Sequence, residues 1–113
     1  MNKEIKEKWI KALRSGKYKQ GQLRLRYDHL GRHKEFCCLG VLCDLHSKET
    51  KTKWNIWKDA KNGCAYMEAN LTPPVAVREW AGIHLNNVGS LVRLNDSKNK
   101  SFNEIADYIE EKL

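Results

Sequence analysis

Apolar side chains recur at helical spacing in the first segment of the chain. They are Ile5, Trp9, Ala12 and Leu13. This spacing predicts an amphipathic helix over about residues 3–15, with Asn2 as its N-terminal cap. Ser15-Gly16 follows the last apolar residue and supplies the left-handed stop of the helix.

The next segment alternates with a period of two, which is typical of a half-buried strand. Leu23, Leu25 and Tyr27 occupy every second position, and the residues between them are polar. Gly31 allows a turn, after which residues 34–36 can return as a second strand. We therefore expect a β-hairpin whose polar face is basic.

The middle of the chain is less regular. Residues 37–45, CCLGVLCDL, are apolar nearly all round, so their periodicity fits a strand or a helix. We favour a buried helix from about Cys38 to Lys48, because polar residues enter only toward its end. Gly40 inside this helix suggests that another backbone packs close to it. Further on, Lys61-Asn62-Gly63 is a turn signal that suggests a second, irregular hairpin.

The last third predicts helices. Thr72-Pro73-Pro74 has the chemistry of a helix start, and Ala81-Gly82 ends that helix. Apolar positions between residues 88 and 95 fit another short helix. Ser101 and Glu104 form a capping box before a final amphipathic helix. Because no internal repeat interrupts this order, we predict a single α+β domain over residues 1–113.

Composition agrees with one globular domain. The chain has 113 residues, of which 41% are hydrophobic and 31% charged. No apolar stretch approaches the roughly 20 residues that span a bilayer, and the charged N-terminal segment lacks the apolar run of a signal peptide. We expect a cytoplasmic protein that makes no membrane contact. A chain of this length has a modest core, so assembly into a homo-oligomer would help it.

The net charge of +7 is unevenly distributed. Residues 1–35 contain 11 Lys and Arg against 4 Asp and Glu, whereas residues 36–113 contain 10 of each. A localised positive field attracts anions, whether a nucleotide, a nucleic acid or an acidic protein surface. A solvated basic surface that only aids solubility is the alternative.

Two arginines of the expected hairpin are candidate phosphate ligands. Arg24 and Arg26 lie two positions apart, so on a strand they point the same way, about 7 Å apart. We expect this pair to face outward with no acid beside it and to bind phosphate oxygens. Aromatic rings further along could stack on a base, although Trp and Tyr also serve as core residues. The candidate ligand-binding residues are Arg24, Arg26, Arg32, Lys34, Trp54, Trp57 and Tyr66.

The four cysteines fit several kinds of chemistry. Cys43 and His46 would share a helix face, and with Cys64 they are candidate zinc ligands, although no C-x2-C knuckle is present. Disulfides need an oxidising compartment, against which the N-terminal segment argues. We favour buried structural cysteines and no bound metal, because the neighbouring residues are apolar.

The alternative to structural cysteines is a nucleophilic cysteine, which would make the protein an enzyme. Cys38 would follow a strand and open a helix, where the positive end of the helix dipole favours the thiolate. His29 and His33 lie on the preceding hairpin and could act as its base. Because no oxyanion signature accompanies them, we rank a cysteine-dependent hydrolase below a protein without catalysis.

Several blocks of the sequence form a recognisable set. The most specific is FCCLGVLCDL at residues 36–45, and the others are ALRSG at residues 12–16, LND at residues 94–96 and SFNEIADYIE at residues 101–110. Together they resemble a family of small uncharacterised bacteriophage proteins. The resemblance covers most of the chain and implies a phage or prophage protein in the bacterial cytoplasm, often a setting for small non-enzymatic inhibitors of host defence. It implies no catalytic or binding residue.

The leading hypothesis is a non-catalytic counter-defence protein. It would sequester an anionic, nucleotide-type ligand through the basic hairpin face and the aromatic residues, without a cofactor. The first alternative is an inhibitor that binds a host defence protein or nucleic acid through the same face. The second is the cysteine-dependent hydrolase. Salt distinguishes nucleic acid from a protein partner, because binding to a phosphate backbone weakens steeply as salt rises, whereas a protein interface with an aromatic anchor is less sensitive.

Overall fold

The computed structural model describes residues 1–29, 33–55 and 57–113. Within these residues the chain forms a single compact α+β domain, as predicted. It contains five α-helices and a four-stranded mixed sheet. The helices are α1 (Lys3–Arg14), α2 (Cys38–Thr50), α3 (Val75–Ala81), α4 (Leu85–Val92) and α5 (Phe102–Lys112), and a π-helical segment, η1 (Arg93–Ser97), continues α4. The strands are β1 (Lys19–Gln20), β2 (Arg26–Asp28), β3 (Lys34–Phe36) and β4 (Gly63–Cys64).

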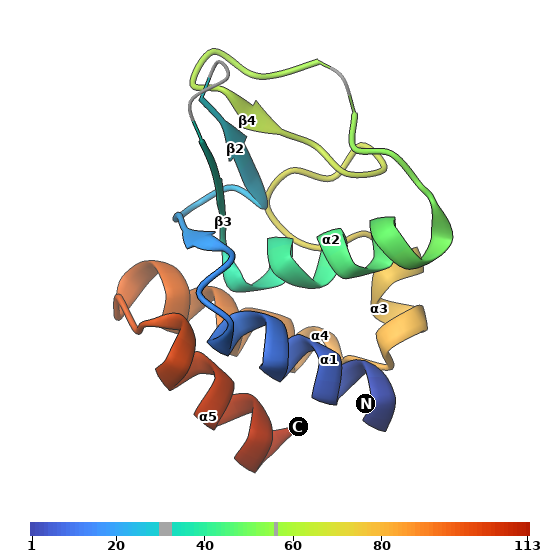
Figure 1. Cartoon of the computed structure of the whole chain (residues 1–113), viewed down its shortest axis with the longest axis vertical. Coiled ribbons are helices and arrows are strands. Elements are labelled where there is room, and N and C mark those ends of the chain that lie inside the picture. Colours follow the sequence, from blue (N-terminus) through green and yellow to red (C-terminus); the bar gives the residue numbers. More distant parts are fainter. Residues whose placement is uncertain (30–32, 56) are drawn as a thin grey trace.

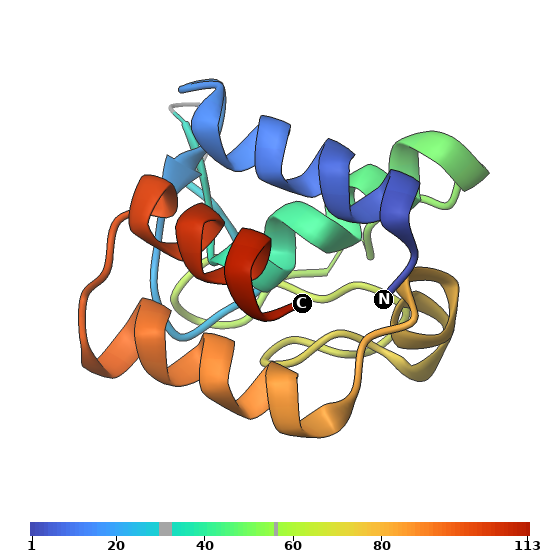
Figure 2. The ribbon, with the colours of Figure 1, turned by 90° about the horizontal axis from the view of Figure 1, so that it is seen from below.

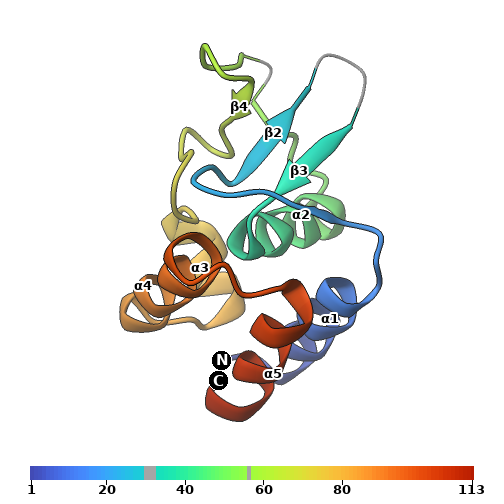
Figure 3. The same ribbon diagram turned by 90° about the vertical axis from the view of Figure 1, so that its left-hand side faces the viewer.

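Sheet and helices occupy opposite ends of the molecule. Figure 1 shows the sheet at one end, with α2 between it and the remaining helices. The strand order is β1-β3-β2-β4, in which β1 is parallel to β3 and the other pairs are antiparallel. Figures 2 and 3 show α1 and α5 side by side, with the two chain ends close together. None of the helices in the described ranges is long and apolar enough to cross a membrane.

The N-terminal helix follows its local signals closely. It ends at Arg14, one residue before the predicted end, and the Asn2 side chain accepts a hydrogen bond from the Ile5 N–H. Trp9 is fully buried, and its indole N–H donates to the Cys38 carbonyl oxygen over 3.0 Å. This bond ties α1 to the first turn of α2.

The central helix is buried as predicted and extends to Thr50. Gly40 is required in it because a Cβ at this position would overlap the backbone carbonyl of Leu25. The close backbone approach that the sequence indicated is therefore confirmed. It brings the segment before β2 directly onto α2.

The first hairpin is confirmed, but its first strand is shorter than the alternation predicts. β2 begins at Arg26, while Leu23 is 61% exposed and has a φ of 77°. The Leu23 N–H donates to the Asp96 carboxylate over 3.1 Å, so this segment bonds to η1 and not to a strand. The expectation that Leu23 lies on the buried face is wrong. The predicted turn at Gly31 lies outside the described residues.

The second, irregular hairpin is confirmed at its turn. The Asp59 N–H donates to the Gly63 carbonyl, and Lys58 pairs with Cys64 in an isolated bridge. Asn62 has a φ of 66°, a conformation that asparagine tolerates in turns. From this turn, β4 continues into the sheet, where it pairs with β2.

The C-terminal helices also match the sequence signals. Helix α3 ends at Gly82 with a φ of 69°. Helix α4 starts at Leu85, earlier than predicted, and the Ser101–Glu104 capping box opens α5. Buried Asn95 joins η1 to α2 and to the residue that follows β1, since its amide donates to the Gly21 carbonyl and its oxygen accepts from the Cys38 N–H.

Candidate functional site

A groove of about 690 Å³ lies beside the sheet. The loop before β1, strands β1, β2 and β3, and the last turns of α2 contribute its walls. Basic side chains outnumber acidic ones among its lining residues. The basic ones are Lys17, Lys19, Arg26, Lys34 and Lys48; the others are Asp28, Asp44, His33, Tyr18 and Phe36. We call this hollow the basic groove.

One face of the β2–β3 hairpin supplies a wall of the basic groove. Arg26 lies opposite Phe36 in the antiparallel register, and Asp28 lies opposite Lys34. Residues two apart on a strand point to the same side, so these four side chains share one face. Tyr18 continues the apolar part of the wall, with its ring edge-on to Phe36 at a centroid distance of 5.0 Å.

Three lysines of the groove have no acidic partner. Among the described residues, no carboxylate lies within ion-pair distance of Lys17, Lys19 or Lys34. Lys48 differs from them, because its Nζ lies 3.3 Å from the Asp44 carboxylate and donates to the Tyr18 hydroxyl over 3.1 Å. The three lysines are therefore available to a ligand, whereas Lys48 belongs to an internal network.

That network also fixes Tyr18. The Tyr18 hydroxyl donates to the Asp44 carboxylate over 2.6 Å. Burial, together with this hydrogen bond, raises the pKa of Tyr18 above its ordinary value. Tyr18 is therefore a neutral hydroxyl at physiological pH, and its ring is held in place in the groove wall.

Arg26 is a largely buried charge in the wall of the groove. Its side chain is only 14% exposed, and its guanidinium lies 5.1 Å from the Trp54 ring centroid and 5.9 Å from that of Phe36. The nearest carboxylate oxygen belongs to Asp28, at 3.6 Å, which is beyond hydrogen-bond range. Within the described part of the chain, the buried Nε of Arg26 has no hydrogen-bond partner.

The expected pair of outward-facing arginines is wrong. Arg24 precedes β2, so strand periodicity does not apply to it, and its Nε donates to the Asp59 carboxylate over 2.8 Å. This bond, with those from the N–H groups of Gly63 and Lys61, lowers the pKa of Asp59 to about 2. Both arginines have an acid beside them, and only Arg26 lines the basic groove.

The remaining predicted ligand-binding residues are dispersed. Lys34 lines the groove, and Arg32 lies outside the described residues. Trp54 is half-buried behind Arg26, and its indole N–H donates to Asp44. Tyr66 is fully buried, so it does not reach the groove, and Trp57 is 47% exposed elsewhere on the surface. Tyr18 and Phe36, which sequence reasoning did not single out, line the groove instead, and Phe36 is buried.

The cysteines are buried free thiols, as the favoured interpretation has it. Burial raises the pKa of Cys37 to about 12 and that of Cys38 well above its ordinary value. Cys38 is fully buried with its thiol facing the Leu91 carbonyl, and the two predicted bases bond to Glu35 instead. The geometry of a nucleophilic cysteine is therefore missing.

The candidate zinc ligands on α2 do not converge. His46 Nδ1 lies 2.6 Å from the Tyr66 hydroxyl in a buried hydrogen bond. Across the described ranges, Cys43, His46 and Cys64 form no cluster of ligand atoms. The cluster that does form joins His29, His33 and Glu35 on the hairpin.

The whole chain, residues 1–113, matches the profile of a family described as a domain of unknown function, DUF8296, and the chain belongs to that family. No curated protein and no solved structure matches it. Family membership thus assigns no activity, and the geometry of the groove and the hairpin remains the basis for a function.

Proposed function

We propose that this member of the DUF8296 family binds a small phosphate-bearing ligand in the basic groove. The observation that carries the proposal is that Lys17, Lys19 and Lys34 have no acidic partner in the described part of the chain. They surround a wall that contains Tyr18 and Phe36. Ammonium groups bind phosphate oxygens as point charges, and the rings offer an apolar surface to a base or sugar. A nucleotide combines both chemistries.

The dimensions of the groove fit such a ligand. Its volume of about 690 Å³ lies within the roughly 300–1,000 Å³ that small-molecule sites occupy. Tyr18 and Arg26 are held in place by internal contacts, so part of the site is formed before a ligand arrives. A preformed site loses less conformational entropy on binding.

Binding without turnover is part of the proposal. It is supported by the burial of all four thiols, which leaves none of them accessible as a nucleophile. We place the protein in the cytoplasm of a phage-infected bacterium, where sequestration of a nucleotide signal would counter host defence. That setting rests on the sequence resemblance to bacteriophage proteins.

Titration calorimetry with pyrophosphate, ATP and a cyclic dinucleotide tests the proposal. We expect at least one of them to bind at one molecule per chain. Lys19→Glu/Lys34→Glu should weaken that binding by at least about tenfold, because two attractive charges become repulsive. The matched control is Lys3→Glu/Lys98→Glu, which makes the same change of charge at exposed positions that do not line the groove.

Two results would contradict a phosphate-ligand site. One is that none of the three probes binds; the other is that both double variants bind equally well. If an oligonucleotide binds through the same lysines and its affinity falls steeply with salt, the ligand of the groove is nucleic acid and not a small molecule.

A further inference from the structure

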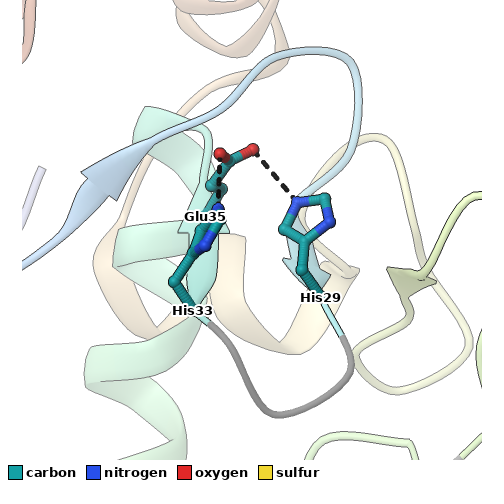
Figure 4. Close-up of side chains that lie close together, drawn as sticks. All are labelled: His29, His33 and Glu35. Atoms are coloured by element: carbon teal, nitrogen blue, oxygen red, sulfur yellow. Dashed lines mark hydrogen bonds and ion pairs between the residues drawn. The ribbon is translucent and has the colours of Figure 1, made fainter.

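The second face of the β2–β3 hairpin brings together three side chains that ligate metals. Tyr27 lies opposite Glu35, and the His29 N–H donates to the His33 carbonyl oxygen over 3.0 Å just beyond the paired strands. Because every second residue of a strand points to the same side, His29 shares a face with Tyr27, and His33 shares one with Glu35. Figure 4 shows the two imidazoles converging on the Glu35 carboxylate.

The distances suit a single small cation. His29 Nε2 lies 3.3 Å from one oxygen of Glu35, and His33 Nε2 lies 3.0 Å from the other. The ligand atoms of all three residues lie within 4.8 Å of one another. Ligands about 2.0–2.1 Å from a tetrahedral zinc ion are about 3.3 Å apart, so small side-chain rotations would close the cluster around an ion.

Neighbouring groups hold the ligands in place. The Tyr27 ring stacks on the His29 ring at a centroid distance of 5.6 Å. Partial burial raises the pKa of Glu35, but hydrogen bonds from His33 and His29 outweigh it, so this pKa lies below its ordinary value.

We propose that His29, His33 and Glu35 form a binding site for one divalent transition-metal ion, with Zn²⁺ as the best-matched metal. Two imidazoles and one carboxylate are a ligand set that zinc uses where a further coordination position is left open. The side chains are 31%, 41% and 24% exposed, in the order named, so that position faces solvent. The site departs from the sequence-based expectation of no metal.

This inference does not depend on the proposed ligand of the basic groove. His33 also lines the groove, so a bound ion would lie at its edge. Lys34, between His33 and Glu35 in sequence, points to the opposite face of the hairpin and belongs to the groove. The two sites can therefore be tested separately.

The test is a zinc titration of untagged protein from which metal has been removed by a chelator. We expect one Zn²⁺ per chain by calorimetry and a rise in the melting temperature of the wild type when zinc is added. His29→Ala and Glu35→Gln should each weaken Zn²⁺ affinity by about tenfold to 100-fold or more. Loss of a residue that only hydrogen-bonds to a metal ligand already lowers affinity by that factor. Binding should also weaken on acidification, because protons compete for the imidazoles.

The matched control is His84→Ala, which removes an exposed histidine at the N-terminus of α4. It should bind Zn²⁺ like the wild type. A measurement on the wild type keeps the test valid if a hairpin variant does not fold: paramagnetic Co²⁺ should broaden the imidazole resonances of His29 and His33 and leave those of His84 sharp. Absence of stoichiometric binding, equal Zn²⁺ affinity in all variants, or broadening at His84 alone would overturn the site.

Discussion

The two faces of the β2–β3 hairpin differ in the charge that they can bind. One face carries Arg26, Lys34 and Phe36 and forms a wall of the basic groove, which suits anions. The other carries His29 and Glu35, which with His33 suit a cation. The two sets are separated only by the alternation of side chains along the same strands. A register shift of one residue would exchange them, so the packing that fixes register is a functional requirement.

Substitution of Gly40 should have the largest effect, because it should disturb both faces of the hairpin at once. In Gly40→Ala the new Cβ would overlap the Leu25 carbonyl, which is backbone and cannot swing away. The segment leading into β2 must then move, and we expect a loss of about 3 kcal/mol or more in the free energy of unfolding. Urea denaturation followed by circular dichroism measures this loss.

Gly89→Ala is the matched control for that substitution. No atom lies within 4 Å of the position of its Cβ, and it lies within α4. Alanine at this site should stabilise the protein by up to about 1 kcal/mol, because glycine is the poorer helix former. If both alanine variants unfold at the same urea concentration, the contact between α2 and the segment before β2 does not fix the hairpin.

The two arginines allow a sharper comparison of binding with stability. Arg26→Met removes a groove charge whose Nε has no partner within the described residues, while Asp28 keeps Lys58 at 3.7 Å. We expect affinity for the phosphate probe that binds to fall about tenfold, and the free energy of unfolding to change by less than about 1 kcal/mol. Calorimetry and urea denaturation on the same samples supply the two values.

Arg24→Met is the same substitution two residues earlier. It should lower stability and leave affinity for the probe nearly unchanged. Arg24 does not line the groove, so affinity for the probe should stay within about twofold. Asp59 loses its ion pair, so the free energy of unfolding should fall by about 1 kcal/mol. A loss of affinity in Arg24→Met equal to that in Arg26→Met would mean that the groove is not the binding site.

These arginines also show where the sequence is insufficient. Local signals such as caps and helical spacing were enough to predict α1 and α5, because each depends on neighbours along the chain. Periodicity alone left α2 open between a strand and a helix, and the helix was favoured because polar residues enter only toward its end. Leu23 and Arg24 were misplaced because their partners, Asp96 and Asp59, are distant in sequence. Strand periodicity cannot account for a bond of that kind.

The histidine cluster was within reach of sequence reasoning. Both histidines were recognised, but as bases for Cys38. The hairpin prediction together with the rule that alternate residues share a face would have placed Glu35 beside His33. The burial of Cys38 was favoured from the sequence and is confirmed, so this thiol is not available as a nucleophile. What the sequence did not show is that both histidines bond to Glu35.

The ion pair between Arg24 and Asp59 should make the free energy of unfolding depend on pH in the acid range. The pKa of Asp59 is about 2 in the folded protein and near 3.8 without its partners. Since the folded pKa is the lower one, the stabilisation is complete above about pH 4 and is lost as pH falls toward 2. Asp59→Asn should be about 1 kcal/mol less stable at pH 7 and should lose less stability than the wild type between pH 4 and pH 2. Parallel acid-limb slopes in urea titrations of the two proteins would contradict this role.

The smallest expected effect couples the two faces directly. Lys34 belongs to the groove, but its charge is close in sequence to two proposed zinc ligands. In Lys34→Glu a charge that repels a cation becomes one that attracts it, from the opposite face of the hairpin, and salt screens such an interaction between exposed charges. We therefore expect Zn²⁺ affinity to rise by about two- to fivefold at low salt and the gain to shrink at physiological salt. Phosphate-probe affinity should fall in the same variant. A parallel fall in both affinities would show that the substitution damages the hairpin itself, whereas opposite changes follow only if the two faces bind charges of opposite sign.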